Sequence, residues 1–462
     1  MKMQDATSLL FADLFPKPTD VTFDEKDTSS DGGSILLEAI SKRMHLLDVF
    51  TEAIEDRRQP GKVDHTVEEL VRQRLFTIGC GYPDANDVER LQDDPIIRLL
   101  AGVRPDATEK TLGSQPTVSR FENAIDLDTC FQIGCRLAEQ MVAYQSKRRK
   151  GKRKPKRITI DLDPTDDPTH GQQTFAFYNT HYDGWCYLPQ TVWITFDDES
   201  EHSLVGVLLR PGNAHATLWT PWILRRLVAL LRKTWGKAKI RVRLDGGFAS
   251  PHIFDLLEEL KVEYLINMAK NERLKALAEP LMKQARKLAA ETGTTQRVFG
   301  ETRYAAGTWE GTERRVIIKA EVVVTPGREP KDNPRFVITN MRHKPENVYG
   351  CYRKRGNCEN RIKELLALEI DRTSCHAFAA NVFRVLLTSA AYMLFQGIRE
   401  RIQDEEMRSA QVWTLREKLF KVAARVKVTF RRIRISLPET YAYVDIFVQL
   451  ARSLGASCTG PP

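Results

Sequence analysis

The sequence predicts an α/β protein whose core is a mixed β-sheet covered by helices. After residue 157, short runs rich in β-branched residues are separated by single amphipathic helical segments, a pattern typical of an α/β layer. From residue 36 to about residue 146, apolar residues recur at three- and four-residue spacings without a strand run, which indicates helices. The chain has 462 residues, so we expect two or three structural units rather than one core.

The order of the elements after residue 157 narrows the fold. Three candidate strands are followed by a helix over 217–235, a strand that ends at Asp245, a helix over 251–261 and a strand over 263–269. The first three candidate strands are 157–163, 185–197 and 202–210. Three strands, a helix and a strand that carries an acid follow the order of an RNase H-like fold.

Two further strand runs, 314–324 and 335–341, lie beyond this core and predict a β-rich insertion at about 272–345. The expected domains are a loosely ordered segment 1–35, a helical DNA-binding region 36–146, a basic linker 147–157, a catalytic domain 158–402 and a helical C-terminal extension 403–462.

Three acidic residues stand in separate motifs. Asp163 lies in IDLDPTDDPTHGQQ, Asp245 in RVRLDGGF and Glu359 in YRKRGNCENRIKELL. The aspartates lie at the ends of β-branched runs and the glutamate lies on a helical segment, so their carboxylates can converge. We expect them to hold two Mg²⁺ or Mn²⁺ ions, an arrangement suited to in-line phosphoryl displacement.

The first motif leaves two choices open. Asp161 and Asp163 are two residues apart on a predicted strand and project to the same face. Asp161 is the alternative metal ligand; its other role would be to pair with a neighbouring backbone or basic group. His170 and Gln172 follow in the loop, where they would either touch the substrate or hold the loop in place.

The helical segment around Glu359 has one chemically distinctive face. Tyr352, Arg355, Glu359, Lys363 and Leu366 advance by three or four residues and so share that face. Arg355 and Lys363 would contact DNA phosphates beside the metal site, with Tyr352 next to them. The alternative is an ordinary surface helix with ion pairs between residues four apart.

The formal net charge of +9 favours a polyanionic partner. Residues 147–157 read KRRKGKRKPKR, with nine basic residues in eleven. Such a run can contact phosphates without reading sequence, and a plain solvated tether is the alternative. The residues expected to bind DNA there are Lys147, Arg148, Arg149, Lys150 and Arg153.

The segment 114–125, SQPTVSRFENAI, resembles the second helix of a helix-turn-helix. Ser114 or Thr117 can cap its start, and Ser119 and Arg120 would face outward to read bases. A core or hinge helix is the alternative.

No run of about 18 uninterrupted apolar residues occurs, and the first residues lack the layout of a signal peptide. The eight cysteines form no CxxC pair, which favours reduced thiols. We therefore expect a cytoplasmic protein without a membrane partner.

Taken together, the motifs resemble bacterial insertion-sequence transposases of the DDE class, in the group whose RNase H-like core carries a β-strand insertion. That group shows a Tyr, two residues, Arg, three residues, Glu, six residues, Lys pattern. Tyr352, Arg355 and Glu359 match it, whereas Leu366 stands at the lysine position and Lys363 comes earlier. The resemblance extends over residues 36–453 through DPTDDPTHGQ, LDGGF, ENRIKE and DRTSCHAFAANVFR.

The resemblance implies a transposase that binds terminal inverted repeats, cuts DNA with Mg²⁺ and joins the freed 3′-hydroxyl to target DNA. It favours Asp163, in an Asp-x-Thr context, over Asp161. It also implies a homodimer that brings two DNA ends together, in a bacterial cytoplasm at the nucleoid. The alternatives are an inactive or domesticated DNA-binding protein and a nuclease of the same fold without strand transfer.

Overall fold

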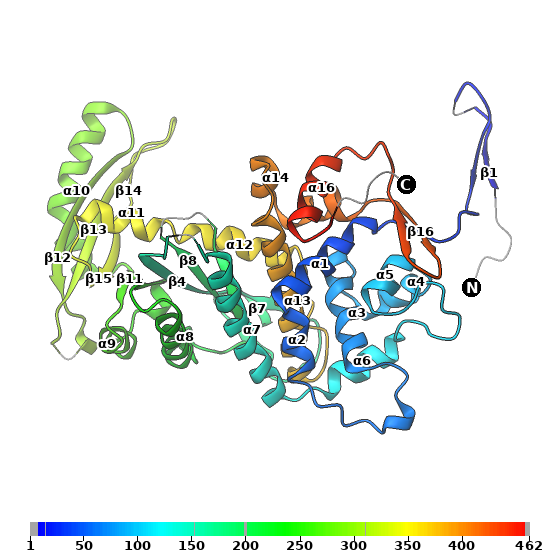
Figure 1. Cartoon of the computed structure of the whole chain (residues 1–462). Coiled ribbons are helices and arrows are strands. Elements are labelled where there is room, and N and C mark those ends of the chain that lie inside the picture. The colour runs from blue at the N-terminus through cyan, green and yellow to red at the C-terminus, as the bar shows by residue number, and fades with distance from the viewer. Residues whose placement is uncertain (1–7, 14, 152, 198–200, 310, 458–462) are drawn as a thin grey trace. The chain divides into compact units, whose positions relative to one another are not determined.

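The computed structural model describes residues 8–13, 15–151, 153–197, 201–309 and 311–457 (Figure 1). The chain forms two compact units, each built from separated stretches of sequence. Unit 1 contains residues 1–43, 56–121 and 397–462, and unit 2 contains residues 44–55 and 122–396. The region 36–146, predicted as one helical domain, is thus shared between the two units.

Unit 1 is mainly helical. Its helices are α1 (Ile35–Met44, whose last residue falls in unit 2), η2 (Pro60–Lys62), α3 (Val67–Cys80), η3 (Ala85–Asp87), α4 (Val88–Leu91), α5 (Pro95–Leu100), most of α6 (Gln115–Ala124), α14 (Glu405–Ser409), α15 (Val412–Leu415), the π-helical turn η6 (Arg416–Phe420), α16 (Val444–Ser453) and η1 (Gly32–Ser34). Its strands are β1 (Ser8–Phe11), β2 (Thr19–Thr22), β3 (Thr28–Ser29), β16 (Ala424–Val428) and β17 (Ile433–Ser436).

Residues 28–31 and 421–428, far apart in the sequence, pair inside unit 1. β3 pairs antiparallel with β16, and the buried carboxylate of Asp31 lies 2.7 Å from the Lys421 ammonium and accepts a 2.8 Å hydrogen bond from the Tyr82 hydroxyl. A Cβ on Gly33 would collide with the Leu419 carbonyl. Although a loosely ordered segment is expected as far as residue 35, its last residues are therefore packed, because buried Asp31 gains a cation from a distant part of the chain.

Unit 2 is built on one mixed sheet. The order of its strands is β12-β13-β15-β11-β10-β4-β8-β9, with β14 added beside β13. The strands are β4 (Arg157–Pro164), β8 (Gln190–Phe196), β9 (Ser203–Leu208), β10 (Lys239–Leu244), β11 (Glu263–Met268), β12 (Gln296–Tyr304), β13 (Arg314–Val323), β14 (Lys331–Asp332) and β15 (Arg335–Thr339).

Five of these strands form the core. β9, β8 and β4 follow one another antiparallel, whereas β10 and β11 run parallel to β4 on its other side. This combination of order and direction confirms the RNase H-like fold that the sequence predicts. β4 and β10, the two strands that precede the aspartates, are neighbours.

The predicted β-rich insertion widens this sheet instead of forming a separate layer. β15 pairs antiparallel with β11, and β13 and β12 follow outward. The long helix α10 (Glu272–Thr292) leads into these strands from β11. Because β13 and β15 are almost fully buried, a run such as RRVIIKAEVVV packs on both faces.

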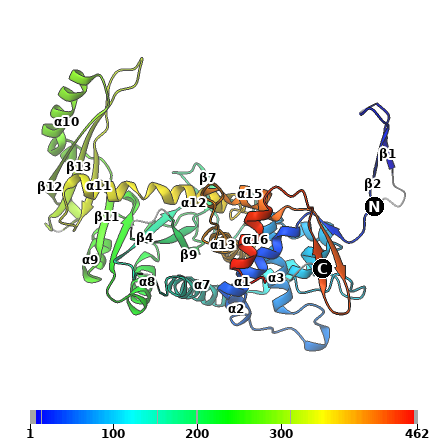
Figure 2. The same ribbon diagram turned by 45° about the horizontal axis from the view of Figure 1, so that its top comes forward.

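Helices cover both faces of the core sheet (Figures 1 and 2). α8 (Thr220–Thr234) and α9 (Pro251–Glu259) lie on one face, and α12 (Gly356–Leu366) lies on the other. The other helices of the unit are α2 (Leu46–Thr51), α7 (Leu127–Arg148), α11 (Pro345–Arg353) and α13 (Phe378–Arg399). By length and composition alone α13 could cross a membrane, but 83% of its most apolar window is buried inside the protein, as in a core helix.

The structure divides one predicted strand into two strands. Residues 185–197 form β7 (Gly184–Tyr187) and β8, and the chain between them contains Pro189, which has no N–H for a ladder hydrogen bond. β7 joins β5 (Asp167–Pro168) and β6 (Phe177–Asn179) in a small separate sheet. The loop that follows Asp163 is therefore itself structured.

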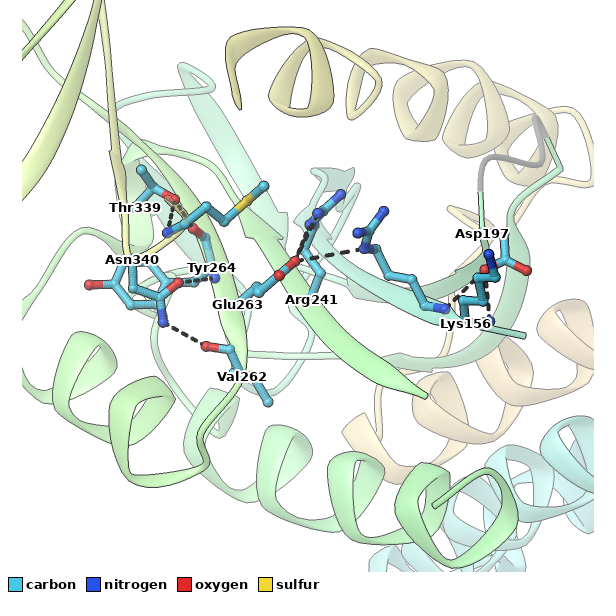
Figure 3. A network of polar contacts seen from close by, with 10 residues as sticks. Lys156, Asp197, Arg241, Val262, Glu263, Tyr264, Thr339 and Asn340 are labelled. Carbon is cyan, nitrogen blue, oxygen red and sulfur yellow. Dashed lines mark hydrogen bonds and ion pairs between the residues drawn. The ribbon is translucent and has the colours of Figure 1, made fainter. Parts of the chain in front are cut away.

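A network of polar contacts lies at the starts of the parallel strands (Figure 3). This is the end of the sheet opposite to that of Asp163 and Asp245. Asp197 accepts 2.9 Å hydrogen bonds from the backbone N–H groups of Lys156 and Arg157. Arg241 donates to Glu263, and Asn340 bridges the backbone at Val262 and Tyr264. These contacts set the strand starts, and hence the register in which the strand ends meet.

Candidate functional site

The first carboxylate, Asp163, lies near the end of the central strand β4. β4 is held between β8 and β10, and its interior residues are buried. The Thr191 hydroxyl donates a 2.8 Å hydrogen bond to the Asp163 carbonyl, which fixes the backbone there. The Asp163 side chain is only 9% exposed.

The second carboxylate, Asp245, directly follows β10. Its Oδ1 accepts a 2.8 Å hydrogen bond from the Gly247 N–H and caps the short turn Gly246–Phe248. A Cβ on Gly247 would lie 3.1 Å from the Ala216 Cβ, a tight contact that glycine avoids. Because parallel neighbours end at the same edge, Asp245 lies beside Asp163.

The third carboxylate, Glu359, lies in the first turn of α12 and is 63% exposed. The sequence indicates one continuous helix from Tyr352 to Leu366; the structure has α11 and α12, joined by Lys354 and Arg355 in right-handed helical conformation. Arg355 and Glu359 still lie four residues apart on one face.

Arg355 brings the three carboxylates together. Its Nη2 donates a 2.6 Å hydrogen bond to Asp163 Oδ1 and lies 3.7 Å from Asp245 Oδ2, while its Nη1 lies 3.7 Å from Glu359 Oε1. Because two of these distances run to one nitrogen, the Asp163 and Asp245 oxygens can be no further apart than both together, about 6.3 Å. Acidic side chains from three elements therefore converge on one buried guanidinium.

The electrostatics of this group favour a cation. Burial raises the pKa of Asp163 to about 7; Arg355 opposes the shift, and Asp245 and Glu359 add to it. For Arg355, burial lowers the pKa and Asp163 raises it, with a net rise. One guanidinium thus faces three acids. Carboxylate oxygens are the ligands that Mg²⁺ and Mn²⁺ prefer, so the donor set fits such an ion.

Asp161 has a different environment. Its two oxygens accept 2.7 Å hydrogen bonds from Nε and Nη2 of Arg243, a forked ion pair that is fully buried at Asp161. Arg243 also donates to the Cys351 carbonyl at 3.0 Å. Both partners are therefore satisfied, and this geometry favours Asp163 over Asp161 as the acid available to a metal ion.

Asp161, His202 and Cys358 place potential ligand atoms within 4.8 Å of one another, all buried. The Arg243 guanidinium takes both Asp161 oxygens and lies 3.4 Å from His202 Nε2. A metal ion would face this cation at short range, so we interpret the group as an ion-pair network within the core.

Two other predicted DNA contacts lie on the same helical segment. Tyr352 is half-buried and packs against the cluster that contains Leu265 and Val337; burial raises the pKa of its hydroxyl to about 12. Lys363 is exposed one turn beyond Glu359, and Leu366 is half-buried. Lys363 can thus reach a ligand in solvent, whereas Leu366 serves packing.

The basic run is only partly a linker. Lys147 and Arg148 form the last turn of α7, and the half-buried Arg149 guanidinium lies 3.9 Å from the centre of the Phe196 ring. Lys150 and Arg153 are exposed. The run ends at Arg157, the first residue of β4, six residues before Asp163. At roughly 3.3 Å per residue, the end of the run lies about 20 Å from Asp163.

The predicted recognition helix corresponds to α6. Arg120 is exposed and its Nη2 lies 3.3 Å from the Thr117 hydroxyl, whereas Ser119 is half-buried. The Ser114 hydroxyl lies 3.1 Å from that of Thr117 at the helix start. Arg120 is thus the more available of the two predicted base contacts.

The loop after β4 contains His170 and Gln172, both exposed. The Gln172 carbonyl lies 2.7 Å from His376 Nδ1, so the segment around it is joined to the region before α13. Neither residue is among those that approach the three acids in the contacts described above, and a substrate contact for them stays a prediction.

Two further residues interact electrostatically with Asp245 and are not predicted from the sequence. Burial, then the charges of Asp166, Asp163 and Asp245, raises the pKa of Tyr182 to about 12. Arg210 is fully buried and, within the described part of the chain, no group accepts a hydrogen bond from its Nη2. Only folding brings them to Asp245, although the isolated arginine in VLLRPG is a signal that a pattern search could flag.

The sheet order and strand directions are those of an RNase H-like protein. The family model "Transposase DDE domain group 1" matches residues 11–458, nearly the whole chain. The chain belongs to this family and is a transposase-type enzyme. Among curated proteins, none matches it.

Proposed function

We propose that this transposase binds the terminal inverted repeats of a bacterial insertion sequence, cuts the DNA there and joins it to a target. Asp163, Asp245 and Glu359 would hold two divalent cations, Mg²⁺ or Mn²⁺. The observation that carries this proposal is the convergence of three carboxylates, from β4, the end of β10 and α12, on the single Arg355 guanidinium.

The carboxylates have separate tasks in this reaction. Bound ions would activate the attacking oxygen and stabilise the leaving one. Asp163 and Asp245 lie at strand ends and give a rigid base for them, whereas the exposed Glu359 side chain can adjust to the substrate. The same acids would serve both hydrolysis at the element end and attack by the freed 3′-hydroxyl on target DNA.

The chain offers several contacts for the DNA backbone. Lys363 lies one turn from Glu359, and the exposed Lys147, Lys150, Arg153 and Lys154 provide a second group of basic side chains. Arg120 on α6 is a candidate for reading bases. We further propose a homodimer that pairs two element ends, in the cytoplasm and at the nucleoid.

The test uses labelled duplexes with the inverted repeats that flank the gene. Asp163→Asn, Asp245→Asn and Glu359→Gln are each expected to lower Mg²⁺-dependent cleavage by about 10³-fold or more, while end binding changes little. Glu369→Gln, at an exposed glutamate just past the end of the same helix, is the matched control and should cleave normally. A variant of the three that cleaves at the normal rate would not be a ligand.

Two experimental outcomes would indicate a different function for the protein. Cleavage without joining of a pre-cut 3′ end to a target plasmid would indicate a nuclease of the same fold. Specific end binding with no cleavage in Mg²⁺ or Mn²⁺ would indicate a DNA-binding protein that has lost its activity.

A further inference from the structure

Arg355 contacts the same carboxylates that would bind metal, and this has a consequence for how metal and DNA are bound. One carboxylate oxygen each of Asp163, Asp245 and Glu359 lies within 3.7 Å of one of the two terminal nitrogens of its guanidinium. A Mg²⁺ ion that coordinates Asp163 through Oδ1 would come within about 2.1 Å of the oxygen that now accepts a 2.6 Å hydrogen bond from Arg355. The two cations compete for one set of oxygens.

Arg355 is held loosely for a buried arginine. It donates one hydrogen bond to Asp163, its other two ion pairs are at 3.7 Å, and within the described residues its Nε has no acceptor. Arg243, two strand positions before Asp245, is held by a fork of two 2.7 Å hydrogen bonds and a third to a carbonyl. Of the two guanidiniums, that of Arg355 would lose fewer hydrogen bonds on moving away from its carboxylates.

The position of Arg355 also suits movement. It occupies the junction of α11 and α12, directly before Gly356, where an added Cβ would meet no atom within 4 Å. The Glu359 carboxylate that its Nη1 faces is 63% exposed, so solvent lies close to that end of the guanidinium.

We propose that Arg355 is an exchangeable counter-ion: it holds the three carboxylates together, is displaced when divalent cations bind, and then becomes available to a DNA phosphate. This inference rests on the proposed function, since it assumes that these acids bind metal. It makes Arg355 a positioning residue, and it links metal binding to DNA binding through one side chain.

Metal binding without DNA tests the exchange. Mn²⁺ titration followed by electron paramagnetic resonance is expected to give a dissociation constant at least about tenfold lower in Arg355→Gln than in the unaltered protein, because a competing charge has been removed. Arg355→Lys, which keeps the charge, should stay nearer to the unaltered protein. Arg361→Gln removes a half-buried arginine on the same helix that pairs with Glu201 and Glu364 and should leave the affinity unchanged. Equal or weaker Mn²⁺ binding by Arg355→Gln would overturn the proposal.

A second measurement uses the unaltered protein and does not depend on how any variant folds. Modification by phenylglyoxal, mapped by mass spectrometry, should increase several-fold at Arg355 when Mn²⁺ is added and stay low at Arg243. Modification of Arg355 that is unchanged or reduced by Mn²⁺ would contradict the exchange.

The coupling to DNA gives a third readout. Ca²⁺, used as a probe of binding without cleavage, should increase the affinity for end duplexes more in the unaltered protein than in Arg355→Gln, since binding linkage is reciprocal. Equal Ca²⁺ effects would remove the phosphate role.

Failure of this inference and failure of the proposed function can be told apart. If Asp163→Asn abolishes cleavage while Arg355→Gln binds Mn²⁺ no better, only the exchange is wrong. If Asp163→Asn and Asp245→Asn bind Mn²⁺ as well as the unaltered protein does, the proposed metal site itself is wrong.

Discussion

At the scale of residues, the site depends on two aspartates that lie two positions apart and have different partners. Asp161 is neutralised by a forked pair with Arg243, whereas Asp163 has one hydrogen bond from the loosely held Arg355. Alternation along a strand puts both on one face, but the sequence does not show which arginine comes to which acid. Asp161 would contribute to the stability of the fold, and Asp163 would contribute to catalysis.

This difference can be measured. Asp161→Asn should reduce the free energy of unfolding by about 3–5 kcal/mol, because one member of a buried ion pair is removed and Arg243 is left unpaired. Asp163→Asn should change stability much less while it abolishes cleavage. Urea unfolding and Mg²⁺-dependent cleavage on both variants provide the comparison. A stable Asp161→Asn protein with a greater loss of cleavage than Asp163→Asn would make Asp161 the ligand.

A second buried acid predicts how stability depends on pH. Burial raises the pKa of Asp167 to about 8; the Thr373 hydroxyl opposes the shift, and Asp371 and Asp166 add to it. The folded state then binds more protons than the unfolded state between about pH 4 and pH 8, so this residue makes stability fall as pH rises through that range. In Asp167→Asn, which resembles the protonated acid, the melting temperature should fall less between pH 6 and pH 8.5. An equal fall in both proteins would show that Asp167 is ionised when folded.

At the scale of elements, the basic run 147–157 has two parts. Its start belongs to α7, where Arg149 stacks on Phe196, and further along Lys150, Arg153 and Lys154 are exposed. Because it enters β4 at the edge opposite Asp163, any phosphates it contacts lie away from the cleavage site. Its expected contribution is to overall affinity.

Replacing Lys147, Lys150, Arg153 and Lys154 with Ser should therefore weaken binding to element ends and to random duplexes alike. The slope of log affinity against log salt should flatten by up to roughly 0.9 for each lost contact. Binding measured at several salt concentrations tests this. Exchanging Lys for Arg and Arg for Lys at the same four positions keeps the charge and should change little; a loss there as large as with Ser would indicate a structural role.

The helix α6 would contribute to the specificity of DNA binding, because Arg120 would contact bases. Arg120→Ala should weaken binding to element ends by about 1–3 kcal/mol more than binding to random DNA, if Arg120 contacts a base edge. Arg120→Lys keeps the charge but loses the fork and should lose specificity as well. Competition assays with both duplexes decide the matter, and equal losses on all DNA would leave α6 with phosphate contact or packing alone.

At the scale of the whole molecule, each compact unit is assembled from distant parts of the chain. Unit 1 needs residues beyond 397 to cover Asp31 through Lys421, and unit 2 begins with residues 44–55. Neither unit corresponds to one continuous fragment, so the full chain is the sensible object for experiments on synapsis.

Pairing of two element ends predicts a change of assembly on DNA. With end duplexes and Ca²⁺, light scattering coupled to gel filtration should show a complex of two chains and two duplexes, whereas random duplexes of equal length should not produce it. A complex of one chain and one duplex under all conditions, with joining activity intact, would rule out a stable dimer.

The sequence by itself was sufficient for the fold class, the order of the core elements along the chain and the presence of strands after them, because β-branched runs and helical periodicity are local properties of the chain. Its three acidic motifs also predicted the carboxylates of the candidate site, and family membership agrees with a DDE-type protein. It could not show that Pro189 divides one predicted strand, or that the insertion continues the core sheet. Above all, only the tertiary structure decided that Arg243 neutralises Asp161 while Arg355 lies beside Asp163 and Asp245, because these pairings join residues 82 to 192 positions apart, and no local pattern records which charges folding brings together.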